Sequence, residues 1–238
     1  MMKRTHGTLA VAALAALLGL TVFAPSIAHA HVSIASGPAF ANTSQEVSFG
    51  VGHGCAGADT VMVSVEIPAG VSSVRPETSD FGQVDVETDA AGSVVLLTWK
   101  KAVERVLAAD TQYYKLNVRL KAPDSPFSTL YFPAHQTCRA SDGTETVVDW
   151  VGIDAAEGSG VEPAPALHVV PARFPGWNKY TLAQPIDDLS AFFGDAQIVW
   201  NGNAAYSANP TTLALIGSTE GVTSLATLAA GDEVWVRY

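Results

Sequence analysis

Residues 60–67, with the sequence TVMVSVEI, decide the fold class of this chain. Val61, Val63, Val65 and Ile67 alternate with polar or solvent-tolerant neighbours. An alternation with a period of two is typical of a β-strand that buries one face and exposes the other. Residues 114–120 repeat the pattern, so we expect at least two strands that each cover one side of a common core.

Further short β-rich segments recur along the chain, and turn-forming residues separate them. Pro, Ala and Gly occupy 68–70, Asp-Ala-Ala-Gly occupies 89–92, and Ser-Asp-Gly occupies 141–143. Turn signals between short strands favour an antiparallel sandwich. The predicted strands are 46–51, 60–67, 94–99, 113–120 and 146–151.

The composition changes over residues 154–171, where Ala, Gly, Glu and Pro dominate. We interpret this stretch as the end of the first domain running into a connector. The remaining residues, 171–238, predict a small β-rich or α+β module, with short helices at 189–193 and 225–228. A module of this size needs its large side chains for burial, so Trp177, Trp200 and Trp235 are expected in its core. If they were exposed instead, they could stack on sugars or on a partner.

The first thirty residues have the three parts of a secretory signal. Lys3 and Arg4 precede an apolar run over 9–23, and Ala28-His29-Ala30 matches the Ala-x-Ala pattern of a cleavage site. The apolar run is shorter than the roughly 20 residues that a membrane-spanning helix needs. We therefore predict a signal peptide at 1–30, a first domain at 31–170 and the C-terminal module at 171–238, with no membrane span after cleavage and a periplasmic or secreted location.

Charge and missing motifs exclude several function classes. The formal net charge is −10, which disfavours a nucleic-acid partner because phosphate binding requires a basic face. The sequence has no Gly-rich phosphate loop, Gly-x-Ser-x-Gly elbow, Cys-x-x-Cys or His-Glu-x-x-His motif. Hydrolase and nucleotide chemistry therefore lack their usual signatures.

The chain has two cysteines, Cys55 and Cys138, and both lie in the part predicted to be exported. Oxidising compartments allow disulfides to persist, so we expect them to pair. The alternative is a pair of thiolates that bind Cu(I), a type of site more usual in reducing compartments.

His31 would become the first residue of the exported protein. A free α-amine and the Nδ1 of the same histidine can close a chelate ring on one metal ion. Cu(II) ranks highest among divalent ions for nitrogen ligands and prefers a tetragonal arrangement, which such a pair begins. The alternative is that His31 is merely the residue next to a cleavage site.

A set of landmarks extends from the His31-Val32-Ser33-Ile34 start to Trp150. They comprise Gly52-His53-Gly54-Cys55, Thr60, Glu66-Ile67-Pro68-Ala69-Gly70-Val71, Phe132-Pro133 and Gln136-Thr137-Cys138. In order and spacing they resemble the YcnI family, also known as DUF1775. The resemblance implies an extracytoplasmic β-sandwich that holds Cu(II) in a one-histidine brace. It further implies that His31 supplies amine and imidazole, that Trp150 lies against the metal, and that an acidic residue can complete the site.

The sequence does not decide between candidates for the remaining ligand. The position of the acidic ligand falls near His53, which could be a further ligand or could only form hydrogen bonds. Glu66 is the acidic alternative. A neutral indole N–H is a donor and cannot ligate copper, so Trp150 would act through its ring face or be a core residue only. His135 and His168 are weaker candidates, and His168 is expected on the surface or in the linker.

The expected fold is all-β, an immunoglobulin-like antiparallel β-sandwich followed by a small β-rich (α+β) module. The expected function is an exported Cu(II)-binding protein that acts as a copper chaperone, scavenger or sensor. For this function we expect no catalytic residues and no enzyme activity. Its partners would be the copper ion and membrane copper transporters or other periplasmic copper carriers. Two alternatives stay open: an oxidative copper enzyme of the polysaccharide-monooxygenase type, with His53 as second imidazole, and a cell-surface adhesion or carbohydrate-binding protein.

Overall fold

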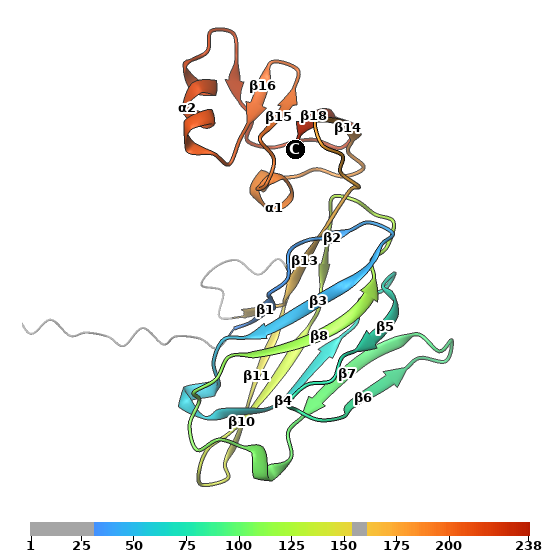
Figure 1. Cartoon of the computed structure of the whole chain (residues 1–238), viewed down its shortest axis with the longest axis vertical. Helices are drawn as coiled ribbons and strands as arrows, with labels where there is room; N and C mark the ends of the chain where they lie inside the picture. Colours follow the sequence, from blue (N-terminus) through green and yellow to red (C-terminus); the bar gives the residue numbers. More distant parts are fainter. Residues whose placement is uncertain (1–30, 154–160) are drawn as a thin grey trace, which may run out of the picture.

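The computed structural model describes residues 31–153 and 161–238 (Figure 1). The predicted signal peptide at 1–30 and part of the predicted connector, 154–160, lie outside the described residues. A β-rich body formed by the first two thirds of the chain carries the C-terminal residues at one end, where α1, α2 and the last strands lie together (Figure 1).

The first sheet of the body has four strands in the order β1-β3-β8-β5, all antiparallel. Its longest pairing joins β3 and β8, with Val47 opposite Val118 and Phe49 opposite Leu116. The strands are β1 (Val32–Ile34), β3 (Ser44–Val51), β5 (Ser72–Pro76) and β8 (Tyr114–Lys121).

The second sheet has six strands in the order β12-β11-β10-β4-β7-β6 and contains the segment that predicted the fold class. Its pairings are antiparallel except for the parallel contact between β11 and β12. The strands are β4 (Asp59–Glu66), β6 (Val84–Thr88), β7 (Val94–Lys100), β10 (Ala134–Arg139), β11 (Glu145–Gly152) and β12 (Glu162–Pro163).

The two sheets bury their apolar faces against each other. Phe49 of the first sheet lies 6.4 Å from Trp99 of the second, measured between ring centroids, and 5.4 Å from Phe132. All three side chains have no exposed surface. Burial of alternate residues from facing sheets is the packing of a β-sandwich, so the predicted all-β sandwich is confirmed.

A small third sheet has the strand order β2-β13-β9. Its strand β13 lies in the stretch 154–171, which was expected to run into a connector. Residues 166–170 form a strand that pairs with β9 on one side and β2 on the other. His168 is not a linker residue: its Nδ1 lies 3.1 Å from the Thr129 hydroxyl, and its ring contacts Phe192. The composition of this stretch suggested a linker, but Leu167, Val169 and Val170 are buried and form part of a strand. The strands are β2 (Ala39–Phe40), β9 (Ser128–Tyr131) and β13 (Ala166–Val170).

The C-terminal residues form a five-stranded sheet in the order β14-β18-β15-β16-β17, with two helices. Its strands are β14 (Trp177–Thr181), β15 (Ile198–Asn201), β16 (Ala204–Tyr206), β17 (Thr223–Ser224) and β18 (Glu233–Arg237). Helix α1 (Leu189–Phe193) is where the sequence predicted it, capped by Asp188. The predicted helix at 225–228 is wrong, whereas helix α2 (Pro210–Ser218) was missed. Short 3₁₀ turns occur at Cys55–Gly57 and Val103–Arg105.

The apolar side chains gather in two clusters. The first fills the sandwich, and the second packs α1 against one face of the C-terminal sheet through residues such as Phe193, Val234 and Val236. Phe127, from the sandwich end, joins the second cluster and contacts Tyr180 and Phe192. Within the described ranges, no helix combines the length and the apolar character that a bilayer span requires.

Candidate metal centre

His31 lies against Trp150. Their ring centroids are 5.2 Å apart and the ring planes are tilted by 21°, a stacked arrangement. His31 is exposed to solvent, whereas only 1% of Trp150 is exposed. One face of the histidine ring is therefore covered by a buried indole, while the residue as a whole is exposed to solvent.

The two residues come from different sheets. His31 precedes β1, and its carbonyl accepts a hydrogen bond from the Gly52 backbone N–H beyond β3. Trp150 lies in β11 opposite Ala134, with its side chain toward the core because Asp149 and Val151 point outward. The edge strand β1 of the first sheet thus places His31 next to Trp150, on the inner face of the second sheet.

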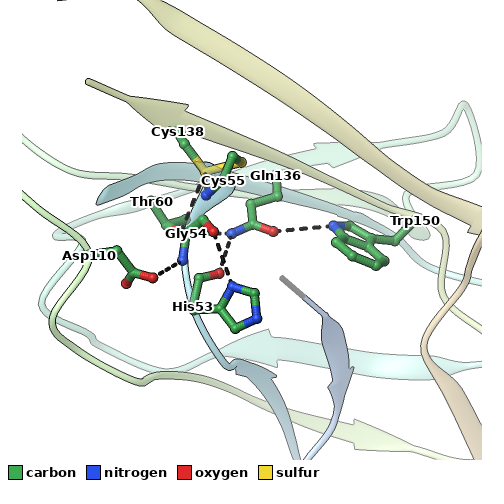
Figure 2. Close-up of a disulfide and its surroundings, with 8 residues drawn as sticks. All are labelled: His53, Gly54, Cys55, Thr60, Asp110, Gln136, Cys138 and Trp150. Carbon is green, nitrogen blue, oxygen red and sulfur yellow. Dashed lines mark hydrogen bonds between the residues drawn. A yellow bond between two sulfur atoms is a disulfide. The ribbon is translucent and has the colours of Figure 1, made fainter. Parts of the chain in front are cut away.

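Gln136 fixes the tryptophan and the neighbouring loop (Figure 2). Its Oε1 accepts a hydrogen bond of 3.2 Å from the Trp150 indole, and its Nε2 donates to the His53 carbonyl at 3.0 Å and to the Thr60 hydroxyl at 2.8 Å. The Gln136 side chain has no exposed surface. One buried amide consequently sets the positions of Trp150 and His53 together.

The His53 loop is held from several sides. Cys55 and Cys138 form the predicted disulfide, which closes 83 residues of sequence separation. The Gly54 N–H donates to the Asp110 carboxylate at 2.5 Å. A Cβ on Gly54 would lie 1.8 Å from the Ala58 carbonyl oxygen, so only glycine fits there. The loop therefore presents His53 from a constrained backbone.

The hydrogen bonding of His53 leaves one ring nitrogen available. Its Nδ1 lies 3.1 Å from the Gly54 carbonyl oxygen, which can only accept. This contact is a hydrogen bond in the tautomer with the hydrogen on Nδ1, and in that tautomer the lone pair is on Nε2. In Figure 2 the His53 ring and the Trp150 indole flank the beginning of β1.

The structure does not bring Glu66 to this pair. Glu66 belongs to a group on the outer face of the second sheet, where His135 lies 2.6 Å from Asp149 and 3.7 Å from Glu66. Val65 and Ala134 turn inward toward Trp150, and strand alternation sends Glu66 and His135 the other way. The acidic alternative named from the sequence is thus separated from His31 by the sheet.

A different carboxylate, Glu162, was missed by the sequence reasoning. Glu162 lies in β12 opposite Trp150. Partial burial lowers the pKa of His31, and the negative charge of Glu162 opposes that shift. The residue lies in the stretch interpreted as a connector, and the sequence has no signal there for a strand beside Trp150.

The candidate donor side chains do not form a cluster in the described part of the chain. Across residues 31–153 and 161–238, no group of three or more His, Cys, Asp or Glu side chains is positioned to hold a metal ion. The residues do fit a chelate that starts from His31 alone, because a histidine with a free α-amine supplies two nitrogens and Trp150 covers one side.

Replacing Gln136 with leucine is expected to weaken both fold and site. The change would leave the buried Trp150 N–H and the His53 carbonyl without their partner, at a cost of about 1–3 kcal/mol for each unsatisfied group. Urea unfolding should show the loss of stability, and the NMR signal of the Trp150 indole N–H should shift. Thr98→Val is a matched control, because it removes one side-chain hydrogen bond, to Ser64, on the outer face of the same sheet. An unchanged indole signal in Gln136→Leu would contradict the positioning role.

The fold and the site define a class: a two-sheet β-sandwich in which the histidine before the first strand lies against a buried tryptophan of the opposite sheet. The family model described as a domain of unknown function (DUF1775) matches residues 31–169. The chain belongs to this family.

A solved structure supports the fold class. The crystal structure of an uncharacterized protein from Nocardia farcinica, described as having an immunoglobulin-like fold, is 29% identical with a TM-score of 0.50. The match covers 59% of this chain and 98% of that one. A DUF4466 family protein from Parabacteroides merdae matches with 11% identity and a TM-score of 0.22, over 84% of this chain and 52% of that one. No curated protein matches. The expected immunoglobulin-like sandwich is confirmed.

Proposed function

We propose that the protein, once processed to begin at His31, binds one Cu(II) outside the cytoplasm as cargo. The observation that carries this proposal is the stacking of His31 on the buried Trp150. An N-terminal histidine held at a defined place differs from a flexible peptide end, because less conformational entropy is lost when the metal binds.

The donor set suits Cu(II). The α-amine and Nδ1 of His31 would form the chelate, and imidazole and amine nitrogens are ligands for which copper ranks highest. The indole N–H of Trp150 is engaged by Gln136, so Trp150 would contribute its ring face and exclude water from one side. The Nε2 of His53, on the loop that Gln136 also contacts, and the carboxylate of Glu162, whose charge acts on His31, are the candidates for a further ligand.

The exposure of His31 favours transfer over catalysis. A site that starts from two nitrogens of one exposed residue leaves the ion accessible to another carrier. That arrangement fits a copper chaperone, scavenger or sensor that exchanges copper with membrane transporters or other periplasmic carriers. We propose no turnover and no resident cofactor beyond the copper cargo.

The Cu(II) affinity should fall as the pH falls, because protons compete for both nitrogens of His31. The amine has a reference pKa of roughly 8, and partial burial lowers the pKa of the imidazole below its usual value. Between the pKa of the imidazole and that of the amine, one proton competes and the affinity should drop by about tenfold per pH unit. Below both pKa values, two protons compete and the drop should be about a hundredfold per pH unit. Titration against a competing chelator at several pH values measures the profile.

The tripeptide His-Val-Ser is the matched control, since it has the same N-terminus without Trp150. The steeper fall of its Cu(II) affinity should begin at a higher pH than in the protein. The imidazole of the tripeptide is fully hydrated, so burial does not lower its pKa. An affinity that does not change between pH 6 and 8 would contradict the proposal. If the copper-loaded protein consumed oxygen in the presence of a reductant and a polysaccharide, the result would favour an oxidative copper enzyme over the cargo role.

A further inference from the structure

Three tryptophans form an open surface on the C-terminal sheet, contrary to the expectation that they fill its core. Trp177 lies in β14, Trp235 in β18 and Trp200 in β15, which are neighbouring strands in that order. Trp200 is directly opposite Trp235. Trp177 is opposite Arg237, two residues from Trp235 and therefore on the same side. We call this surface the tryptophan face.

The module does not need these side chains for its core. The opposite side of the same strands is buried by Val199, Val234 and Val236, which pack in the second apolar cluster. Trp177 and Trp235 are each 49% exposed. Large apolar side chains grouped on a surface usually mark a binding site, since exposure forgoes the stabilisation that burial would give.

The tryptophan face is hollowed. Trp177, Trp200, Trp235 and Gly202 line a concavity of about 420 Å³ that is open to solvent. Gly202 has a positive φ of 58°, and no atom lies within 4 Å of the place where its Cβ would be. The absence of a side chain there keeps the rim of the concavity open between β15 and β16.

The tryptophan face carries one cation that no acidic side chain neutralises within the described residues. Residues 171–238 contain three cations, Arg173, Lys179 and Arg237, and two of them share the face with Trp235. Lys179 pairs with Glu233 at 2.8 Å and lies 5.9 Å from the centre of the Trp235 ring. Within the described residues no carboxylate pairs with the Arg237 guanidinium. Glu233 alternates with Trp235 and lies on the same face, so it neutralises Lys179, and the net positive charge of the face is that of Arg237, in a chain of net charge −10.

We propose that the tryptophan face binds a polysaccharide whose sugar rings carry carboxylates. A pyranose ring presents C–H groups on a flat face that pack on an indole, while its polar groups project from the ring edge. Three indoles on adjacent strands offer contacts to successive sugars, and Arg237 meets a carboxylate at the edge.

The shape and lining favour a glycan over other occupants. A site for a small molecule usually encloses most of its ligand, whereas this concavity is open. The lining has no Leu, Ile, Val or Met, which an apolar protein or lipid contact would be expected to supply beside the tryptophans.

Affinity gel electrophoresis of the copper-free mature chain tests the proposal. The gels would contain polygalacturonate, alginate or polyglucuronate, with pullulan as a neutral polysaccharide and polyglutamate as a polyanion without sugars. We expect retardation by at least one of the three polyuronates only. Trp235→Ala and Trp177→Ala should each weaken it by about tenfold or more, consistent with hot-spot tryptophans. Arg237→Gln should weaken it and reduce its sensitivity to salt.

Leu215→Ala is the matched control, because Leu215 is 66% exposed on α2 and does not line the concavity. It should bind like the unchanged chain, and circular dichroism should report the same fold for all variants. Retardation by none of the polyuronates, equal retardation by pullulan or polyglutamate, or binding that survives both tryptophan changes would overturn the proposal. Binding to anionic phospholipid vesicles in place of the polyuronates would also overturn it.

Discussion

Replacing His31 with alanine in the chain that begins at residue 31 is expected to weaken Cu(II) binding by more than about a hundredfold. Loss of a group that only supports a ligand typically costs roughly 10–100-fold in metal affinity, and this change removes an imidazole ligand itself. The α-amine would remain, but it could no longer close a chelate with a side chain. Isothermal titration against a competing chelator measures the difference.

His135→Ala is the matched control for this variant. His135 is a histidine of the same domain, but it lies on the outer face of the second sheet beside Asp149. Its replacement should leave the copper affinity unchanged. His53→Ala should have an effect between the two if Nε2 of His53 completes the site. Full affinity in His31→Ala together with a loss in His135→Ala would place the copper on the outer face and contradict the account.

Replacing Asp59 with alanine is expected to destabilise the sandwich by about 3–5 kcal/mol, the cost of leaving one partner of a buried ion pair alone. Asp59 has no exposed surface, and its carboxylate accepts hydrogen bonds from Lys101 at 2.8 Å and from Tyr114 at 2.7 Å. Lys101 is itself buried and donates to the Tyr114 hydroxyl. Burial, followed by the hydrogen bond to Asp59, raises the pKa of Tyr114 well above its usual value, so the phenol stays neutral and donates.

Urea unfolding with the disulfide intact measures this loss. Glu145→Gln is the matched control, since Glu145 forms an ion pair with Arg139 at the surface of the same sheet, and such pairs contribute no more than about 1 kcal/mol. Replacing Asp59 and Lys101 together with leucine and methionine should recover much of the stability, because no uncompensated charge remains. A loss in Asp59→Ala no greater than in Glu145→Gln would show that the buried pair is not what stabilises this end of the sandwich.

The strands of the sandwich could be predicted because each buries one face, and burial of one face leaves an alternating pattern in the sequence. Residues 60–67 gave the position of β4 within a residue. The disulfide could also be predicted, since only two cysteines were available. That His31 and Trp150 belong to one site was implied only by the family resemblance, and their stacking was not predicted, because no local pattern relates a residue before β1 to one in β11.

The errors have physical causes. Helix α2 has an Asn209 cap and Pro210 in its first turn, which are start signals, but its short apolar pattern was overlooked. Trp235 alternates with Val234 and Val236, and alternation alone does not tell which face a neighbouring helix will cover. Gln136 and Glu162 belong to the site through pairing between distant strands, a relation that a single sequence does not contain.

The central claim is that the α-amine and imidazole of His31 together hold Cu(II). Electron paramagnetic resonance of the protein with one equivalent of Cu(II) tests it most directly, using a chain that begins at His31 and one with a single extra alanine in front. The account predicts nitrogen coupling and tight binding in the first chain, and the loss of both in the second. The same spectrum and the same affinity in the two chains would contradict it.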